Sequence, residues 1–402
     1  MQDTTIPAGT QAVSAMLSHA ARYSPYYREQ QWASRLRAGR EVSFQEIPIT
    51  PKTLVRDQTE QFYGSFVPPS EGKVHVKHTS GSSGEPMQVL KTQRHFQINL
   101  TENRRHMDAW GFSSHRRVAH ILFPDLEHPV GRLEERSLPG GGQQWDLSTL
   151  NTGDALDLFR RTAASLVLAF PSIMLGVLER CAELGQALPI RLISTVSEVV
   201  PDELRRYARQ IPNCRLMDIY GCVEAGLIAV QCPQCDAYHP ADRHLILEFI
   251  TDSGRPAGPG ELGRVIITPL FNRAMPLIRY ETGDYAVLAG NKGCPYSPRA
   301  IARIVGREKN LFKLPDGEKV AAMLPSGIAH HLGVRQFKLF QTSYAEVELH
   351  YVPRAGDAEI EEAAAQTIVN RYLSPRFRVH CRRVSEIPRL PSGKYIMHEC
   401  LI

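Results

Sequence analysis

The chain has 402 residues, of which 43% are hydrophobic and 22% are charged, and its formal net charge is +5. A chain of this length can form two or three domains with a large core, and its composition is ordinary for a soluble globular protein. Because the net charge is slight for this length, it favours anionic substrates only weakly and does not indicate a nucleic-acid-binding protein.

Membrane targeting and a disulfide framework are not indicated either. No apolar run approaches the ~20 residues that span a bilayer, and the N-terminal residues resemble neither a signal peptide nor an amphipathic transit segment. We therefore expect a cytoplasmic protein without a membrane partner. Its eight cysteines are then expected to be thiols or metal ligands.

The first predicted elements surround a loop near residue 80. Residues 11–22 have apolar positions at helical spacing and end before Pro25, which predicts a helix. An alternating segment at 73–77 predicts a strand that runs into the loop. A second strand at 89–91 and a helix over 93–110 are predicted to follow it.

The loop itself is rich in glycine and hydroxyl side chains. Glycines allow positive φ angles, so that backbone N–H groups can approach an anion, and the hydroxyls add further donors. We therefore interpret the loop as a phosphate site, with a plain turn or linker as the alternative. Its candidate ligands are Thr79, Ser80, Gly81, Ser82, Ser83 and Gly84.

In the middle of the chain, predicted strands alternate with predicted helices. The strands cover residues 117–123, 166–170, 191–195 and 215–220. The helices cover residues 154–165, 201–210 and a segment that begins at Pro171. This alternation predicts an α/β fold with a largely parallel sheet flanked by helices, and ligands bind such sheets beyond the carboxyl ends of the strands.

The pattern changes in the last third of the chain. Residues 244–269 read as strand, turn and strand, which predicts an antiparallel subdomain. The last ~90 residues are predicted to form a small α+β unit. We place the domain boundary between a large N-terminal domain at 1–306 and a small C-terminal domain at 307–402.

Five short motifs in a fixed order identify a family resemblance. They are Thr-Ser-Gly-Ser-Ser-Gly-Glu-Pro at 79–86, Tyr-Gly-Cys-Val-Glu at 220–224, Tyr-Glu-Thr-Gly-Asp at 280–284, Gly-Arg-Glu-Lys at 306–309 and Pro-Ser-Gly-Lys at 391–394. Together they closely resemble the motifs of the adenylate-forming superfamily, which includes acyl-CoA ligases, nonribosomal adenylation domains and luciferases. The segment Ser-Pro-Tyr-Tyr-Arg at 24–28 and the chain length resemble its phenylacetate-CoA ligase branch.

The resemblance implies an AMP-forming acid–thiol ligase whose small C-terminal domain is a mobile lid. ATP and Mg²⁺ would activate an aromatic acid, aryl or arylacetic, as an acyl-adenylate. The acyl group would then pass to coenzyme A, with a carrier-protein thiol or an amine as alternative acceptors. Either a monomer or a homodimer is compatible with this assignment.

The resemblance also implies roles for single residues in the large domain. Tyr220, beside Gly221, would pack on the adenine ring, although a core tyrosine is the alternative. Glu224 would help to hold Mg²⁺, where an isolated glutamate is normally a solvated charge. Asp284 would accept from both ribose hydroxyls, whereas Thr-Gly-Asp can also be an ordinary turn.

Three basic residues complete the implied site. Arg307 would contact the ribose or a phosphate, Lys309 would be the hinge, and Lys394 would stabilise charge during adenylate formation. Arg307 and Lys394 could instead be exposed surface residues without these roles.

Two positions depart from the family pattern. Val223 stands where the family usually has a threonine whose hydroxyl contacts phosphate or the substrate, and valine can donate nothing. Met87 stands where many members have a lysine. A nucleotide-binding relative without turnover is therefore a further alternative.

A cysteine and histidine cluster predicts a metal site. Cys232 and Cys235 form a CxxC pair, His239 follows four residues later, and Cys294 lies beyond the antiparallel segment. Three thiolates and an imidazole suit tetrahedral Zn²⁺, and a closed set of four ligands indicates a structural ion. A redox pair or unrelated thiols are the alternatives.

The acid pocket is less well determined by the sequence. The family lines this pocket with the segments that correspond to residues 170–172 and 196–198. His120, His128 and Arg132 could contact a polar substituent of the acid, and each could equally be a surface residue.

Overall fold

The computed structural model describes residues 10–79, 86–111, 117–122, 124, 128–138, 141–290, 294, 300–322, 328–354, 359–388 and 396–402. The chain divides into two compact units, Met1–Ser113 with Ile219–Ile304 and Ser114–Asp218 with Val305–Ile402. The boundary at residue 306 between a large domain and a mobile one stays a prediction.

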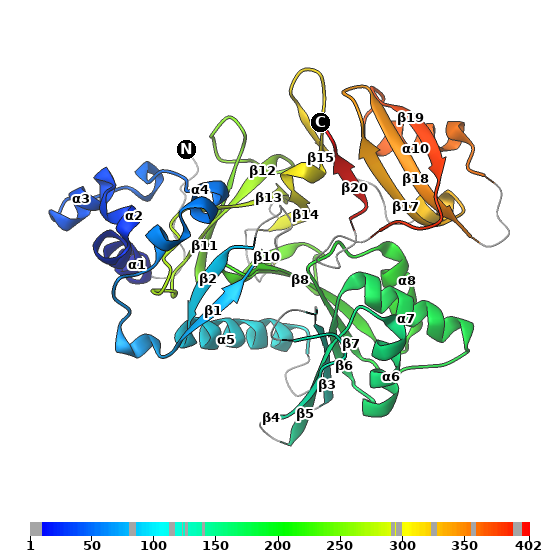
Figure 1. The fold of residues 1–402 in the computed structure, drawn as a ribbon, viewed down its shortest axis with the longest axis horizontal. Helices are drawn as coiled ribbons and strands as arrows, with labels where there is room; N and C mark the ends of the chain where they lie inside the picture. The colour runs from blue at the N-terminus through cyan, green and yellow to red at the C-terminus, as the bar shows by residue number, and fades with distance from the viewer. Residues whose placement is uncertain are drawn as a thin grey trace. The chain divides into compact units, whose positions relative to one another are not determined.

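The first unit begins with short helices that pack on its core (Figure 1). The predicted helix at 11–22 is confirmed as α1, which extends one residue further at each end. Helix α2 begins at Pro25, because proline lacks only a backbone N–H that has no partner in the first turn of a helix. Met16 and Tyr27 are buried in this core. The helices are α1 (Thr10–Tyr23), α2 (Pro25–Arg28), α3 (Gln31–Arg37), α4 (Lys52–Asp57) and the 3₁₀ turns η1 (Phe44–Glu46), η2 (Thr59–Phe62) and η3 (Pro69–Glu71).

The predicted phosphate loop joins two antiparallel strands. These are β1 (Val74–His78) and β2 (Gln88–Thr92), and His78 pairs with Gln88 at the base of the loop. Helix α5 (Gln93–Ala109) follows at once, with the Thr92 hydroxyl accepting from the His95 N–H at 3.1 Å as its N-cap. Both strand predictions and the helix prediction are confirmed here.

The rest of the first unit is an antiparallel sheet. The predicted strand–turn–strand at 244–269 is confirmed, because Leu245 pairs with Pro269 and Ile250 with Arg264. Buried apolar residues such as Ile228 and Ile267 form its core. Its strands are β9 (Gly226–Gln231), β10 (Tyr238–Pro240), β11 (Leu245–Ile250), β12 (Leu262–Pro269) and β13 (Tyr280–Leu288).

Two strands pass from one unit into the other, β8 (Arg215–Cys222) and β14 (Ile301–Arg307). Strand β8 is two residues longer than predicted, because it forms a hairpin with β9 in which Cys222 pairs with Gly226. Gly221 and Cys222 therefore lie within the strand as well, after Tyr220, its predicted last residue.

The second unit contains the predicted α/β segment. Strands β3, β5, β6 and β7 pair in parallel, and β4 adds to β5 in the antiparallel direction. Phe159, Ile173 and Leu204, one from each helix, lie in the core beside the sheet. The elements are β3 (Arg117–Leu122), β4 (Leu133–Leu138), β5 (Gly142–Ser148), β6 (Leu166–Ala169), β7 (Leu192–Val196), α6 (Thr152–Thr162), α7 (Pro171–Glu183) and α8 (Asp202–Gln210).

The C-terminal residues form the predicted α+β structure around a core of their own. Strands pair in the order β19-β18-β17-β20, and Phe312, Leu349 and Val369 are among the core residues. The elements are η4 (Glu308–Asn310), β15 (Leu311–Lys313), β16 (Lys319–Ala321), α9 (Ile328–His331), β17 (Val334–Gln341), β18 (Glu346–Pro353), α10 (Glu362–Tyr372), β19 (Arg378–Arg383) and β20 (His398–Cys400). The α/β class with an added antiparallel part and a C-terminal α+β part is confirmed.

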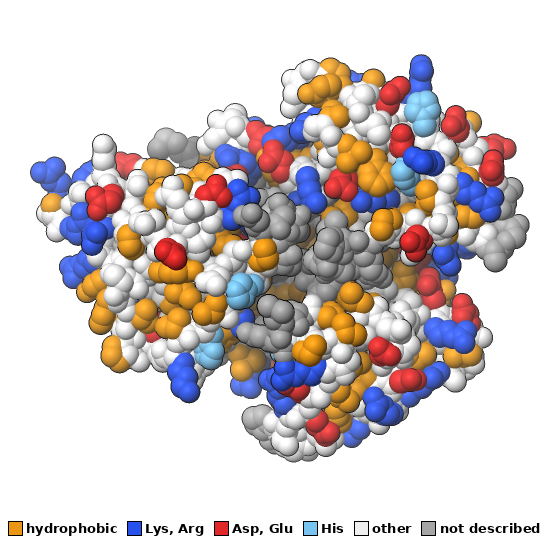
Figure 2. Space-filling model, viewed as in Figure 1, with side chains coloured by type: hydrophobic (Ala, Val, Ile, Leu, Met, Phe, Trp, Pro, Cys, Tyr) orange, Lys and Arg blue, Asp and Glu red, His pale blue; other side chains and the backbone are white. Residues whose placement is uncertain are grey.

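The surface agrees with the small net charge. On the face in Figure 2, basic and acidic side chains of the described residues are interspersed. Among the helices of the described ranges, none has the length and apolar character that crossing a membrane requires.

Candidate functional site

The turn between β8 and β9 carries Glu224 and depends on two glycines. Gly221 lies so close to β9 that an added Cβ would be 2.5 Å from the Gly226 carbonyl oxygen. Gly226 has φ +79°, and a Cβ there would be 2.2 Å from Asn99 Oδ1. That oxygen accepts from the Leu227 N–H at 2.8 Å, so helix α5 holds the turn in place.

Glu224 is a buried carboxylate with two donors. Its side chain is 2% exposed, and Oε1 accepts from Lys52 Nζ at 3.1 Å and from the Tyr280 hydroxyl at 2.7 Å. Burial by itself would raise the pKa of Glu224, but the Lys52 charge and the two donors outweigh burial and lower this pKa to about 2. The carboxylate is therefore ionised at neutral pH, as a ligand of a hard cation must be.

Lys52 was not predicted from the sequence. It stands in the first turn of α4, and its Nζ also donates to the Thr282 carbonyl oxygen at 3.2 Å. It thus joins the Glu224 turn to the Thr-Gly-Asp segment. Neither its spacing nor its neighbours in the sequence indicate this contact, which spans 172 residues.

Tyr220 and Asp284 come together although 64 residues separate them. The Tyr220 hydroxyl donates to Asp284 Oδ2 at 2.9 Å, and both residues are 8% exposed. Burial and the nearby Asp284 charge raise the pKa of Tyr220 well above its usual value. The Thr282 hydroxyl accepts from the Asp284 N–H at 3.1 Å and orients this segment.

The base of the phosphate loop is closed by Thr79. Its N–H donates to the Met87 carbonyl oxygen at 3.0 Å, and its Oγ1 accepts from the Met87 N–H at 2.9 Å. The other predicted loop ligands lie outside the described residues: Ser80, Gly81, Ser82, Ser83 and Gly84.

The predicted basic residues belong to the second unit. Arg307 is the last residue of β14. Lys309 Nζ lies 3.7 Å from Glu399 Oε1, and Lys338 binds the same carboxylate at 2.8 Å. Lys394 lies outside the described residues. The nucleotide, hinge and catalytic roles of these residues stay predictions.

The four predicted metal ligands do come together. One ligand atom from each of Cys232, Cys235, His239 and Cys294 lies within 4.8 Å of the others. Cys232 Sγ is 3.7 Å from Cys294 Sγ, and Cys235 Sγ is 3.2 Å from His239 Nε2. Two thiolates on a tetrahedral zinc ion, at about 2.3 Å each, lie about 3.8 Å apart, whereas a disulfide holds its sulfurs at about 2.05 Å. The donor set and its spacing therefore fit a four-coordinate ion.

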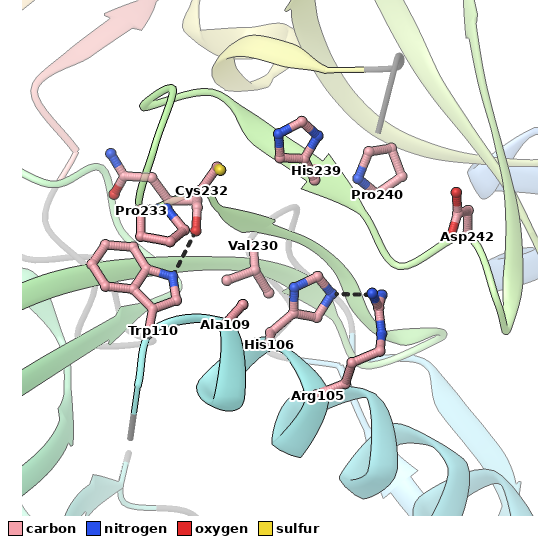
Figure 3. A pocket seen from close by; sticks show the side chains of 11 residues that line it. Arg105, His106, Ala109, Trp110, Val230, Cys232, Pro233, His239, Pro240 and Asp242 are labelled. Carbon is pink, nitrogen blue, oxygen red and sulfur yellow. Dashed lines mark hydrogen bonds between the residues drawn. The ribbon is translucent and has the colours of Figure 1, made fainter. Parts of the chain in front are cut away.

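A pocket lies between this cluster and helix α5. Figure 3 shows Arg105 and His106 of α5, with Trp110 directly after the helix, on one side and Cys232 and His239 on the other. The Trp110 indole N–H donates to the Gln231 carbonyl oxygen at 2.9 Å, next to the first cysteine. The same helix thus supports both the Glu224 turn and the metal cluster.

The segments expected to line the acid pocket lie in the second unit. Glu198 accepts from the Ser172 N–H at 2.9 Å and from its hydroxyl at 3.1 Å, so this carboxylate caps α7. His120 Nδ1 lies 3.1 Å from Asp146 Oδ1, a buried carboxylate. Arg132 pairs with Glu134.

Comparisons with known proteins agree with the sequence resemblance. No protein-family model matches the chain. Phenylacetate-coenzyme A ligase of Pseudomonas putida is 27% identical over 281 residues, which cover 66% of this chain and 62% of that protein. The enzyme of the same name from Aromatoleum evansii is 24% identical over 405 residues, which cover 94% of this chain and 90% of that protein.

A solved structure has the same fold. The crystal structure of 2-hydroxyisobutyryl-CoA ligase in its postadenylation state matches with a TM-score of 0.71 and 17% identity, over 96% of this chain and 87% of that one. The resemblance to the adenylate-forming superfamily and its phenylacetate-CoA ligase branch is thus confirmed. The alignment with the Pseudomonas putida enzyme covers less than two thirds of that protein.

Proposed function

We propose that the chain is an AMP-forming acid–thiol ligase that activates an aromatic carboxylic acid with ATP and Mg²⁺ and transfers the acyl group to coenzyme A. This proposal rests on direct contacts between motifs that lie far apart in the sequence. Tyr220 bonds to Asp284 at 2.9 Å, and Tyr280 bonds to Glu224 at 2.7 Å. Relatives named phenylacetate-coenzyme A ligase support an aromatic acid and a coenzyme A acceptor.

In the first half-reaction, a carboxylate oxygen of the acid attacks the α-phosphorus of ATP and pyrophosphate leaves. In the second, the thiol sulfur attacks the acyl carbon, the thiol loses its proton, and AMP leaves. Both steps concentrate negative charge, which positively charged groups and backbone N–H donors stabilise. The Gly/Ser loop that starts at Thr79 would bind the phosphates. Lys394 would stabilise the negative charge that develops during adenylate formation.

The remaining residues would hold the nucleotide and the metal. Asp284 would accept from the ribose hydroxyls, and Tyr220 would contact the adenine ring while its hydroxyl stays on Asp284. The ionised Glu224 fits Mg²⁺, which prefers carboxylate oxygens and would neutralise part of the phosphate charge when bound. Arg307 would contact the ribose or a phosphate, and Lys309 would be the hinge of the lid.

We further propose that the cysteine and histidine cluster holds a structural Zn²⁺. The four side chains supply a complete tetrahedral set, which leaves no position for a reacting group. The ion would tie Cys294 to the β9–β10 segment, across about 60 residues of chain. Its effect would therefore be on stability and not on the chemical step.

Exchange of labelled pyrophosphate into ATP, measured with a panel of aryl and arylacetic acids, tests the adenylation proposal. We expect exchange that depends on Mg²⁺ and on at least one of these acids. Exchange with no acid in the panel would favour the alternative that Val223 motivates, a nucleotide-binding relative without turnover. If exchange occurs but coenzyme A gives no thioester, the acceptor would be a carrier-protein thiol or an amine.

A further inference from the structure

Helix α5 buries polar side chains where a core helix normally buries apolar ones. Its buried residues are His95, Asn99 and Glu102, whose spacing puts them on one face, whereas Leu100 is 52% exposed. Asparagine and histidine are weaker helix formers than leucine, and burying a polar group costs free energy unless it finds a partner. We therefore expect the buried face of α5 to make contacts that apolar side chains cannot make.

Asn99 makes such a contact with the backbone of β9. Its Nδ2 donates to the His95 carbonyl oxygen at 3.0 Å and lies 3.1 Å from His95 Nε2, while its Oδ1 accepts from the Leu227 N–H at 2.8 Å. Burial lowers the pKa of His95 to about 3, so the ring is neutral at pH 7 and its Nε2 can accept from the amide. His95 therefore fixes the Asn99 amide in the orientation that binds Leu227.

His244 binds the other polar group of the Leu227 backbone. Its Nε2 lies 2.9 Å from the Leu227 carbonyl oxygen, and because a carbonyl oxygen can only accept, Nε2 carries the proton. Strand β10 pairs with β9 as far as Ala229, so Leu227 lies beyond the end of β10. Buried backbone groups need partners, and two side chains supply them where β10 has ended.

We propose that Asn99 and His244 are positioning residues for Glu224, the carboxylate assigned above to Mg²⁺. This inference rests on the proposed function, since it concerns the same metal ligand. Glu224 lies three residues before Leu227, in the turn that follows the pairing of Cys222 with Gly226. By holding Leu227 from two elements, the two side chains restrict the end of this turn, as outer residues orient the ligands of many metal sites.

The alternative is that both residues stabilise the hairpin without any effect on the metal. Their loss would then lower the melting temperature and leave metal binding unchanged. Trp110 provides the matched control, because its indole N–H donates to the Gln231 carbonyl oxygen at 2.9 Å, four residues further along the same strand. Trp110→Phe therefore removes a hydrogen bond to the β9 backbone at a distance from the Glu224 turn.

The test measures metal binding directly, by electron paramagnetic resonance, as Mn²⁺ in place of Mg²⁺ is titrated into the protein with saturating ATP. Asn99→Leu and His244→Phe should each weaken Mn²⁺ binding about 10- to 100-fold, the usual effect of losing an orienting partner. Asn99→Asp keeps an oxygen that can accept from the Leu227 N–H, so it should recover most of this loss. Trp110→Phe should bind Mn²⁺ like the wild type. AMP, measured by calorimetry without metal, should bind equally to all of these proteins.

Unchanged Mn²⁺ affinity in Asn99→Leu and His244→Phe would overturn the inference, as would an equal loss in Trp110→Phe or a parallel loss of AMP binding. If Asn99→Leu does not fold, the comparison of His244→Phe with Trp110→Phe decides. Mn²⁺ binding that depends on both residues, in a protein that catalyses no pyrophosphate exchange, would overturn the adenylation proposal and keep this one. A wild type that binds no Mn²⁺ beyond that held by free ATP would overturn the role of both residues.

Discussion

Replacement of Glu224 by glutamine should destabilise the protein by an amount that depends on pH. The folded protein lowers the pKa of this carboxyl from 4.5 to about 2, because the charge of Lys52 and the hydroxyl of Tyr280 outweigh the opposing effect of burial. A depressed pKa means that the ionised group stabilises the folded state above about pH 4.5. This stabilisation is lost as the pH falls from there towards 2.

The size of the effect follows from the two pKa values. A difference of about 2.5 units corresponds to about 3 kcal/mol at pH 7, of which about 2 kcal/mol remain at pH 3.5. Since the Lys52 side chain is 23% exposed, solvent screens part of the pair and the larger figure is an upper estimate. The amide oxygen that Glu224→Gln introduces can still accept from the Tyr280 hydroxyl. The difference in stability between this variant and the wild type therefore reports the loss of the negative charge.

Urea unfolding at pH 7 and pH 3.5 measures this difference in the free energy of unfolding. The matched control is Glu261→Gln, because Arg255 also lowers the pKa of Glu261 to about 2. That pair lies on the surface, where solvent screens it, so we expect little change in the control at either pH. The reasoning is refuted if Glu224→Gln loses less than about 1 kcal/mol at pH 7, or if its loss is the same at both pH values.

Three further predictions concern the nucleotide, the lid and the metal. Asp284→Ala should weaken ATP binding about 30- to 150-fold by calorimetry, because a charge-assisted contact is lost, and unaltered affinity in a folded variant would count against the ribose role. Lys394→Ala should reduce acyl-adenylate formation by several orders of magnitude and spare thioester formation from a supplied acyl-adenylate; an equal loss of both would contradict the assignment. Protein purified without added metal should contain about one zinc per chain, and Cys235→Ser, but not Cys214→Ser, should lower both the zinc content and the melting temperature. Full retention of zinc in Cys235→Ser would exclude the cluster as the site.

Local patterns in the sequence were sufficient for much of the fold. Strand β6 and helix α7 were predicted because a buried apolar run is followed by a proline at the start of a helix. Strand β4 was missed because it is an edge strand whose sequence, Leu-Glu-Glu-Arg-Ser-Leu, is mostly exposed and has no apolar alternation. Its charged residues pair along the surface, as Arg136 does with Glu134 at 2.7 Å.

The candidate site was predictable where its ligands have a fixed spacing. The CxxC pair and His239 lie within eight residues, so the sequence alone groups them, and the fold adds Cys294. Lys52 has no such signal. It acquires its neighbours Glu224 and Thr282 only when the segments near 220 and 280 fold against helix α4, so no local pattern could identify it.

The fate of one oxygen atom tests the central proposal most directly. The acid that gives pyrophosphate exchange would be labelled with ¹⁸O in its carboxyl group and converted to its coenzyme A ester. If the acid attacks the α-phosphorus of ATP, one labelled oxygen must remain on AMP when the thiol displaces it, and mass spectrometry should find this label in AMP. Unlabelled AMP alongside the thioester would contradict an acyl-adenylate intermediate and with it the proposed function.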